Sequence, residues 1–438
     1  MNCHALLCAA LPLLAAAIIT LAGDRVGRRG VVAISSAALV LAFGASVAIG
    51  QAFAAGKNSL VAELGPWLPL RGGDIALVVV PTTLPVLIAT TLVSAAIAVA
   101  SWRVRQTRAY QLAILLGTAA LVLVATAGNL ALFTAAFGLL GAATYIALSH
   151  DHERAAAAAG AERALVVDRL GDGALLLATL GYLALFRTLD LAEIETRVVA
   201  TRVADITFIG PSVFLCAGIL AKSAQLPFQA RATALREAPL GLATFGALAF
   251  AANAVALTRV SFLVHPGVLA AAAALGTLSA LLAVVLAATR ADGRAALAWI
   301  AIAPAGIEIV TIGAGASEMA LTIFVVTAIA LTSLTAIAAI GRPHLRWRGA
   351  GPARARRALA DGFGFLAVFV AVARGYGAIA KALEDGTDAS LDRLLGWVAA
   401  ATLRAGRIVA HAEAGPAWRV EAIGVAALIA FVAYWGLR

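Results

Sequence analysis

Charged residues are few in this 438-residue chain: they make up 13% of it, whereas hydrophobic residues make up 62%. The mean hydropathy is +0.96. So few charges on so apolar a chain exclude a soluble domain and predict a polytopic α-helical membrane protein. The apolar runs are continuous rather than alternating, which excludes a β-barrel.

Cysteine is also rare. The three cysteines, Cys3, Cys8 and Cys216, all lie in apolar segments without a C-x-x-C pair, which excludes a disulfide framework. The first apolar run, Ala5–Ala22, lacks the basic start and small-residue cleavage site of a signal peptide. We therefore expect a retained first span.

Lysine is the scarcest cation, with three residues against thirty arginines. Lys57 and Lys381 fall in polar connections, but Lys222 ends the apolar run Ile206–Leu226. Placing an ammonium in hydrocarbon costs roughly 3 kcal/mol on insertion scales, so an intramembrane lysine indicates a functional site. A desolvated lysine can lose its proton, which an arginine cannot. Lys222 is therefore the natural candidate for a proton-handling group.

Apolar runs long enough to cross roughly 30 Å of hydrocarbon predict an all-α bundle of about fourteen spans. The stretch 391–412 is ambiguous, because arginines interrupt its apolar residues and it could also lie on the surface. The other runs are 5–22, 31–54, 75–100, 110–127, 130–149, 165–186, 206–226, 239–263, 267–289, 295–313, 318–341, 359–380 and 417–437.

The net charge of +10 indicates topology rather than nucleic-acid binding. With the N-terminus outside, all the arginine-rich loops fall on one face, which the positive-inside rule makes cytoplasmic. We expect a multi-pass protein of the cell inner membrane. The loops are Asp24–Arg29, Arg103–Arg108, His150–Arg169, Arg290–Arg294 and Arg342–Arg357.

The pattern divides the chain into three parts. Residues 1–108 hold N-terminal spans with an external hairpin over 56–74, residues 109–341 form a core, and residues 342–438 hold a basic loop with C-terminal transmembrane or amphipathic helices. Within the core, Pro227 and Pro239 bracket the polar stretch Gln229–Glu237, which predicts a broken helix. Broken helices beside charged residues are a hallmark of ion paths in transporters.

Two groups of charged residues stand in apolar surroundings. Arg169 and Asp172 open one expected span and Lys222 lies on the next, so an intramembrane ion pair is one interpretation. Alternatively, Arg169 and Asp172 cap the span while Lys222 snorkels to the rim. Glu308 is isolated in an apolar run and must be protonated or paired, with a neutral, hydrogen-bonded glutamate as the bland alternative.

No pattern predicts a metal or cofactor. His150-Asp151-His152-Glu153 has the composition of a metal cluster, but its spacing fits no common site. No arrangement of Ser, His, Asp or Cys suggests nucleophilic chemistry, so we expect no catalytic site of its own and no bound cofactor.

The run Ala221-Lys222-Ser223-Ala224-Gln225-Leu226-Pro227 resembles the K-S-A-Q-F-P segment of the antiporter-like membrane subunits of respiratory complex I (NuoL type), with relatives in Mrp antiporters and DabB-type inorganic-carbon uptake complexes. Glu237-Ala238-Pro239 resembles the family's E-G-P, and Val167 to Asp172 its V-x-R-x-G-D. The resemblance covers most of residues 110–340.

The resemblance implies a subunit that supports proton or cation movement coupled to other membrane subunits and a soluble subunit. It implies ion-translocation roles for Lys222, Asp172, Arg169 and Glu237, to which the apolar setting adds Glu308. The chain also departs from the family. The glutamate that pairs with the lysine falls on Gly138, a histidine falls on Gly246 or Ala247, and the span 316–340 contains neither histidine nor lysine.

Two alternatives stay open at the level of sequence. The stretch Ala254–Val264 resembles the DabB branch, which implies uptake of carbon dioxide or bicarbonate with a zinc-containing partner. Alternatively, loss of the channel residues leaves a non-conducting scaffold that anchors partner subunits.

Overall fold

The computed structural model describes the first 340 residues with short gaps: residues 3–22, 25–103, 107–149, 155–200, 206–290 and 293–340. The expected spans at 359–380, 391–412 and 417–437, the basic segment 342–357 and the cluster His150 to Glu153 lie outside the described residues.

Within the described residues, nine helices are long and apolar enough to cross a membrane. With two shorter apolar helices, they cover every span predicted before residue 341, and the predicted class of a transmembrane helix bundle is confirmed. The principal helices are α1 (Cys3–Ala22), α2 (Arg28–Ala54), α3 (Leu84–Ala100), α4 (Arg108–Thr126), α5 (Leu130–Leu148), α6 (Ala155–Phe186), α8 (Ile209–Lys222), α10 (Leu240–Val255), α12 (Pro266–Thr289), α14 (Ile302–Gly313) and α15 (Ser317–Ile340).

Shorter elements join these helices. They are the strands β1 (Leu60–Pro66) and β2 (Asp74–Val79), the helices α7 (Leu191–Ala200), α9 (Ala230–Ala234), α11 (Leu257–Val260) and α13 (Gly293–Ile300), and the 3-10 turns η3 (Ile206–Phe208), η4 (Leu235–Glu237) and η5 (Ser261–Leu263).

Two expected boundaries were wrong. The run 75–100 was predicted to be one span, but its first residues form β2 and the helix starts at Leu84. The β-branched run Val78–Val80 favours a strand, and Pro85 lies in the first turn of α3, where proline is tolerated. The predicted loop His150–Arg169 is helical from Ala155, because its alanine run has the highest helix propensity. Arg169 and Asp172 consequently lie well inside α6 rather than at its start.

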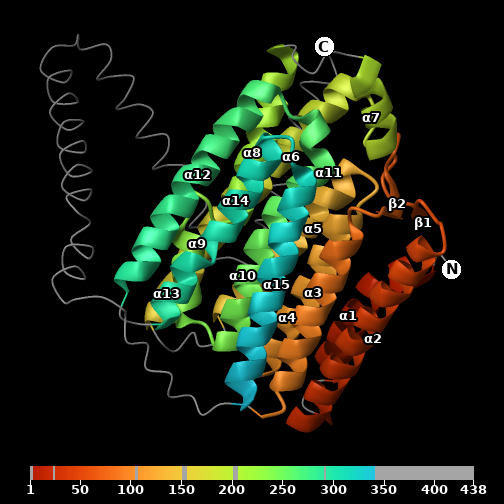
Figure 1. Cartoon of the computed structure of the whole chain (residues 1–438). Helices are drawn as coiled ribbons and strands as arrows, with labels where there is room; N and C mark the ends of the chain where they lie inside the picture. Colours follow the sequence, from red (N-terminus) through yellow and green to blue (C-terminus); the bar gives the residue numbers. More distant parts are fainter. Residues whose placement is uncertain are drawn as a thin grey trace, which may run out of the picture. The chain divides into compact units, whose positions relative to one another are not determined.

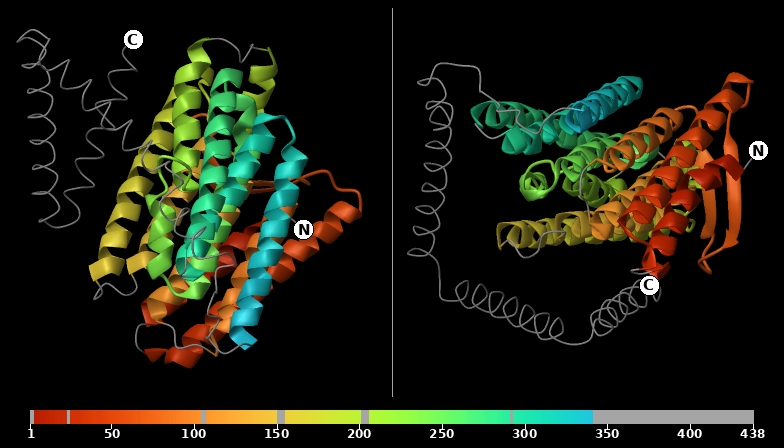
Figure 2. Two further views of the ribbon diagram at one scale, coloured as in Figure 1. Left: turned by 60° about the vertical axis from the view of Figure 1, so that its left-hand side comes forward. Right: turned by 90° about the horizontal axis from the view of Figure 1, so that it is seen from below.

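The bundle surrounds α4 and α10. Of the candidate span that contains α10, 83% is buried, against 28% for α12 at the periphery. Figures 1 and 2 show α1, α2 and the hairpin at one side of the bundle and α12 to α14 at the other. Although far apart in sequence, α15 and α3 pack side by side. The buried position of α10 places any side chain it carries among several other helices.

The hairpin packs against α1 and α4. β1 and β2 pair antiparallel, from Leu60 opposite Val79 to Pro66 opposite Asp74. The side chain of Asn129 donates to the Asp74 carbonyl at 2.5 Å. Gly72 has a φ of +70°, and a Cβ there would lie 2.4 Å from the Asp190 backbone nitrogen. Only glycine fits this close approach, which fixes the hairpin against the loop before α7.

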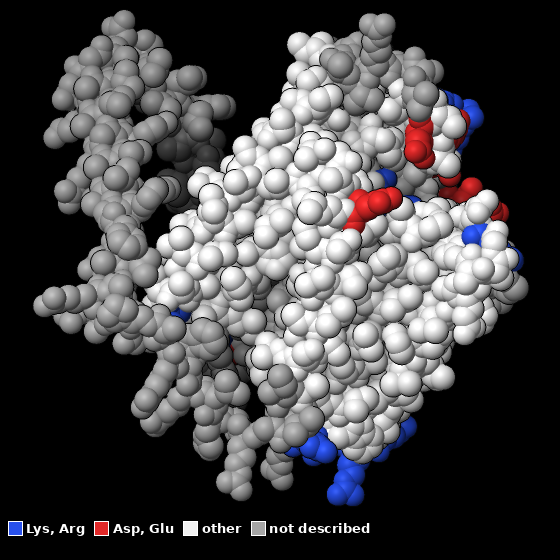
Figure 3. Space-filling model, in the orientation of Figure 1, with Lys and Arg blue, Asp and Glu red and all other residues white. Residues whose placement is uncertain are grey.

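Charged side chains gather at the two ends of the bundle. Figure 3 shows blue side chains below the lower helix ends and both red and blue side chains toward the hairpin, with an almost uncharged surface between them on the side shown. We call the end that holds the α1–α2 and α3–α4 connections the basic end. Its exposed cations include Arg25, Arg28, Arg29 and Arg103. The opposite, hairpin end holds β1, β2 and α7.

At the hairpin end, α7 is held by an ion-pair network. Glu193 contacts Arg71 at 2.5 Å and Arg197 at 2.6 Å. A hydrogen bond from Thr188, together with the Arg197 and Arg71 guanidiniums, lowers the pKa of Glu193. Because these groups are solvent-accessible, the network orients α7 rather than adding much stability.

Candidate functional site

Lys222 is the last residue of α8, inside the bundle. A helix of 14 residues is roughly 21 Å long and cannot cross the hydrocarbon alone. It ends because Ala224 adopts a left-handed conformation with φ of 56°, so that Gln225 N bonds Leu220 O at 2.9 Å and Ala224 N bonds Ala221 O at 3.2 Å. This double closure is the Schellman motif. It terminates α8 at depth and leaves the Lys222 carbonyl to find donors elsewhere.

Two side chains from beyond the break supply those donors. Asn253 of α10 donates to the Lys222 carbonyl at 2.8 Å, and Arg231 of α9 also donates to it. Arg231 also donates a hydrogen bond from Nη2 to Thr144 Oγ1 of α5 at 3.1 Å. Its Cζ lies over the Phe250 ring, 5.4 Å from the ring centroid. Irregular backbone at membrane depth requires such satisfaction by protein groups. The polar stretch after Pro227 thus turns back to support the end of α8.

The Lys222 ammonium is fully enclosed and faces two carboxylates. Its Nζ lies 2.5 Å from Asp172 Oδ1 and 3.0 Å from Asp168 Oδ1, and it donates to the Phe137 carbonyl at 3.3 Å. Asp168 and Asp172 lie one helical turn apart on α6 and so share a face. The side chain of Lys222 is 0% exposed. Lys222 therefore points into the bundle, away from the outer helix faces.

Each carboxylate has a second cation. Arg231 Nε lies 3.1 Å from Asp168 Oδ1, with both side chains 1% exposed. Arg169 Nη1 lies 3.4 Å from Asp172 Oδ2, with side chains 55% and 19% exposed. Asp168 is consequently locked between two buried cations, whereas Asp172 is shared between a buried ammonium and a more accessible guanidinium.

Glycines make room for this cluster. A Cβ at Gly141 of α5 would lie 3.2 Å from both Lys222 Nζ and Arg169 Nη2. Gly171 of α6 and Gly218 of α8 let these two helices approach closely, since a Cβ at Gly218 would lie 2.5 Å from Leu175 Cγ. Small residues allow such close helix contacts in membranes. The approach of α6 and α8 brings Lys222 within reach of the two aspartates.

The sequence did not single out Asp168, Arg231 or Asn253. A signal existed for Asp168, which lies four residues before Asp172 and on its helical face. Asp168 also occupies the variable position of the V-x-R-x-G-D pattern. No sequence signal marked Arg231, because its place depends on the reversal of the chain after α8.

The remaining predicted site residues lie outside this cluster. Glu237 ends η4, half-buried, with Oε1 at 4.0 Å from Arg236 Nε. Glu308 of α14 is fully buried, and among the described residues neither of its carboxyl oxygens has a hydrogen-bond partner. Gln225 links the two regions, since its amide donates to Ser223 O at 2.9 Å and to Ile302 O at 3.3 Å. A polar connection therefore runs from the break to the start of α14.

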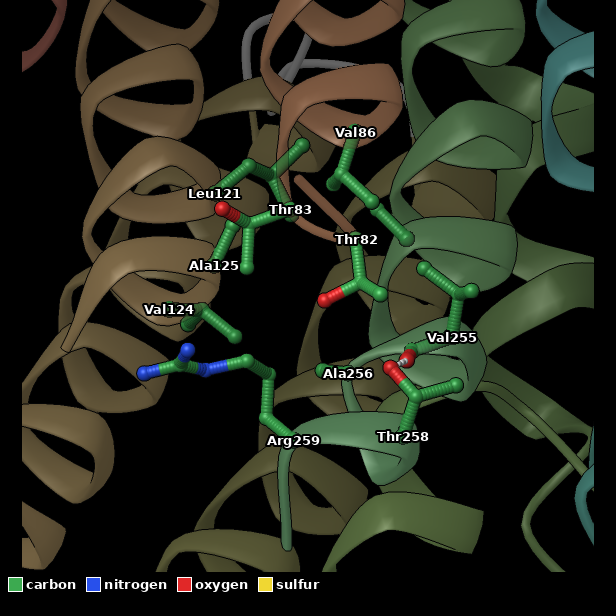
Figure 4. A pocket seen from close by; sticks show the side chains of 11 residues that line it. Thr82, Thr83, Val86, Leu121, Val124, Ala125, Val255, Ala256, Thr258 and Arg259 are labelled. Carbon is green, nitrogen blue, oxygen red and sulfur yellow. Dashed lines mark hydrogen bonds between the residues drawn. The ribbon is translucent and has the colours of Figure 1, made fainter. Parts of the chain in front are cut away.

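A small cavity lies on the far side of α10 (Figure 4). Its volume is about 10 Å³, and Thr82, Thr258 and Arg259 are among its lining residues. Arg259 extends toward α4 and donates to the Ala127 carbonyl at 2.8 Å. Such a volume holds about one water molecule, so the cavity is too small for an organic substrate. Within the described ranges, no group of His, Cys, Asp and Glu is placed to hold a metal ion.

Comparison with known proteins adds three findings on sequence. Residues 127–373 match the model of a family described as NADH:quinone oxidoreductase/Mrp antiporter, transmembrane. The chloroplastic NAD(P)H-quinone oxidoreductase subunit 5 of Carpenteria californica is 28% identical over 204 residues, 45% of this chain and 28% of that protein. The subunit 5 of Adiantum capillus-veneris is 31% identical over 196 residues, 42% of this chain and 26% of that protein. The match thus spans little more than a quarter of these relatives.

Solved structures share the fold. A chain of the Mrp complex from Dietzia sp. superposes with a TM-score of 0.67 at 22% identity, over 77% of this chain and 37% of that one. A chain of an archaeal membrane-bound sulfane sulfur reductase gives 0.68 at 17% identity, over 78% and 71%. The fold of the described bundle is therefore that of subunits from multi-subunit membrane complexes.

Proposed function

Because the chain belongs to the NADH:quinone oxidoreductase/Mrp antiporter transmembrane family, we propose that it is an antiporter-like subunit that passes protons through Lys222 within a larger membrane complex. The observation that carries this proposal is the charge balance of the cluster around Lys222. Asp168 and Asp172 supply two negative charges, and Arg231 and Arg169 supply two positive ones. The ammonium of Lys222 is the charge in excess.

That excess singles out the lysine proton as the exchangeable one. Arginine does not release its proton at accessible pH, so the two guanidiniums hold the carboxylates balanced in either state of Lys222. When Lys222 is neutral, the cluster carries no net charge, and when it binds a proton, it carries one positive charge. In the structure the Lys222 ammonium also donates to the Phe137 carbonyl.

Asp172 is the movable partner in the proposed mechanism. Lys222 contacts its Oδ1 and Arg169 contacts its Oδ2, whereas Asp168 also contacts the buried Arg231. A shift of Asp172 toward Arg169, driven by a neighbouring subunit, removes one counter-charge from Lys222 and favours release of its proton. A shift back favours uptake. Arg169 therefore tunes the cycle without itself carrying the proton.

The proposed path extends from the cluster in two directions. Glu237, half-buried in the polar stretch beyond the break, serves the side nearer the surface. Gln225 connects the break to α14. There the carboxyl of Glu308, which has no hydrogen-bond partner among the described residues, supplies a second proton-binding group. Arg259 and its water-sized cavity lie further toward the hairpin end.

We place the basic end in the cytoplasm and the hairpin end outside, in the inner membrane of a cell. The exposed arginines at the ends of α1 to α4 support this orientation under the positive-inside rule. The proposed partners are further membrane subunits and a soluble subunit. Membership of a family found in such complexes supports this assignment.

Asp172→Asn tests the mechanism. We expect the variant complex to assemble and to lose coupled proton transport, because a neutral amide cannot alternate between Lys222 and Arg169 as a counter-charge. Proton uptake is measured with a pH-sensitive dye in liposomes that contain the purified complex. Glu162→Gln, the same change on an exposed position of α6, is the matched control and should transport normally. Normal transport by both variants would contradict the mechanism. It would favour the alternative in which this chain is a non-conducting scaffold for partner subunits.

A further inference from the structure

A cavity of about 300 Å³ opens at the basic end, where the first turns of α2 and α4 converge. Val26, Gly27 and Arg28 line it from the α2 side, and Thr107, Arg108 and Gln111 line it from the α4 side. It is separate from the cluster around Lys222 and has no part in the proposed proton path. At this volume it admits a small polar group as well as several waters.

The donors of this cavity suit an anion. Gly27 is the N-cap of α2 and has no side chain to bond the first-turn N–H groups. Those groups and the helix dipole favour a negative charge. Arg28 and Arg108 line the same space, and guanidinium geometry matches phosphate oxygens. The segments 24–29 and 103–108 together carry six arginines and one aspartate.

Gln111 adds a requirement for a donor on the ligand. Its side chain is 1% exposed, and its Nε2 donates to Ser101 Oγ at 2.7 Å. Its Oε1 is buried, and no described group donates to it. Buried polar atoms are nearly always hydrogen-bonded, so an orphan acceptor that lines a cavity needs an explanation. A ligand hydroxyl beside the anionic group would satisfy it.

We propose that this cavity binds the headgroup of an anionic glycerophospholipid, with the phosphodiester at the arginines and the α2 N-terminus and a glycerol hydroxyl at Gln111. The basic end lies where helix ends meet the lipid headgroups, and basic pockets between transmembrane helices bind such headgroups. The excess of arginine favours an anionic headgroup over a zwitterionic one. Phosphatidylglycerol is the simplest lipid with both groups.

Lipid retention by the purified complex tests the site. The complex is reconstituted in nanodiscs of equal phosphatidylglycerol and phosphatidylethanolamine, extracted, and its bound lipid is counted by native mass spectrometry. We expect Arg28→Gln/Arg108→Gln to lower retained phosphatidylglycerol by at least about tenfold, since each cation near the surface contributes about 1 kcal/mol. The matched control, Arg29→Gln/Arg103→Gln, removes the same charge from the same two connections outside the cavity and should retain the lipid.

A third variant tests the contribution of the headgroup hydroxyl separately from that of the headgroup charge. Gln111→Met keeps the length of the side chain and the charges, and should lower the preference for phosphatidylglycerol over phosphatidic acid, which lacks the glycerol hydroxyl. Equal loss of lipid in both arginine pairs would overturn the proposal in favour of a general basic surface. Displacement of the lipid by inorganic phosphate alone, without effect of Gln111→Met, would also overturn it and indicate a free-phosphate site.

Discussion

Lys222→Ala is expected to abolish coupled proton transport while the complex still assembles. Alanine removes the exchangeable proton, yet it leaves Asp168 and Asp172 balanced by Arg231 and Arg169. The cluster therefore loses its excess charge rather than gaining an uncompensated one, and replacing a buried ion by an apolar group need not destabilise a protein. Transport is measured by dye-reported proton uptake in liposomes, and assembly by the subunits that co-purify.

Lys222→Arg is expected to fail nearly as badly, for a different reason. Arginine keeps its charge at all accessible pH values and cannot release a proton. A guanidinium is also larger than an ammonium, and the space is so narrow that even a Cβ at Gly141 would lie 3.2 Å from Lys222 Nζ. Lys57→Ala, which removes an exposed lysine near the hairpin, is the matched control and should transport normally. Full transport by correctly assembled Lys222→Ala complex would end the proton-handling hypothesis for this residue.

Asp168→Asn is expected to have the largest effect on stability. Its carboxylate lies within 3.1 Å of two buried cations, Lys222 and Arg231. Removing one partner of a buried ion pair costs about 3–5 kcal/mol, because the opposite charge stays buried without compensation. The effect should appear as reduced yield of the chain and a lower unfolding temperature in detergent. Asp172→Asn, on the same helix face but partly accessible, should destabilise much less and act mainly on transport.

A double variant distinguishes lost charge balance from lost packing. Asp168→Asn/Arg231→Met removes one charge of each sign and should recover part of the stability lost in Asp168→Asn. If the double variant is as unstable as the sum of the two single variants, the pair is not coupled as the geometry requires. Equal destabilisation by Asp168→Asn and Asp172→Asn would likewise contradict the distinct roles assigned to the two aspartates.

Much of the bundle was predictable because hydrophobic length alone determines where spans lie in a membrane protein. The broken helix was predictable as well, since Pro227 and Pro239 flank a polar stretch that no lipid can accommodate. The strand β2 was missed because Ile75 to Val80 is as apolar as a span, and hydropathy does not separate the two. The early start of α6 was missed because the charged residues on either side of its alanine run favoured a loop in the sequence analysis, despite the helix propensity of alanine.

Only the site residues that lie within apolar helical runs could be predicted from the sequence. Lys222 and Asp172 were identified from their isolation among apolar residues and from a motif, and the structure brings them to 2.5 Å. Arg231 could not be identified, because its contact with Asp168 joins residues on either side of a chain reversal. The sequence left open what replaces the family's glutamate, which falls on Gly138. A Cβ at Gly138 would meet nothing within 4 Å. A carboxylate partner for Lys222 comes from Asp168 on α6 instead of from position 138 on α5.

The protonation state of Lys222 is the most direct test of the account. The chain has three lysines, so a complex in which only this subunit carries 15Nζ-lysine gives three resonances, and Lys222→Met identifies one of them. With a proton gradient imposed across reconstituted membranes, the account predicts that the Lys222 resonance divides between ammonium and neutral amine, while Lys57 stays ammonium. A Lys222 resonance that remains wholly ammonium with and without the gradient would contradict it.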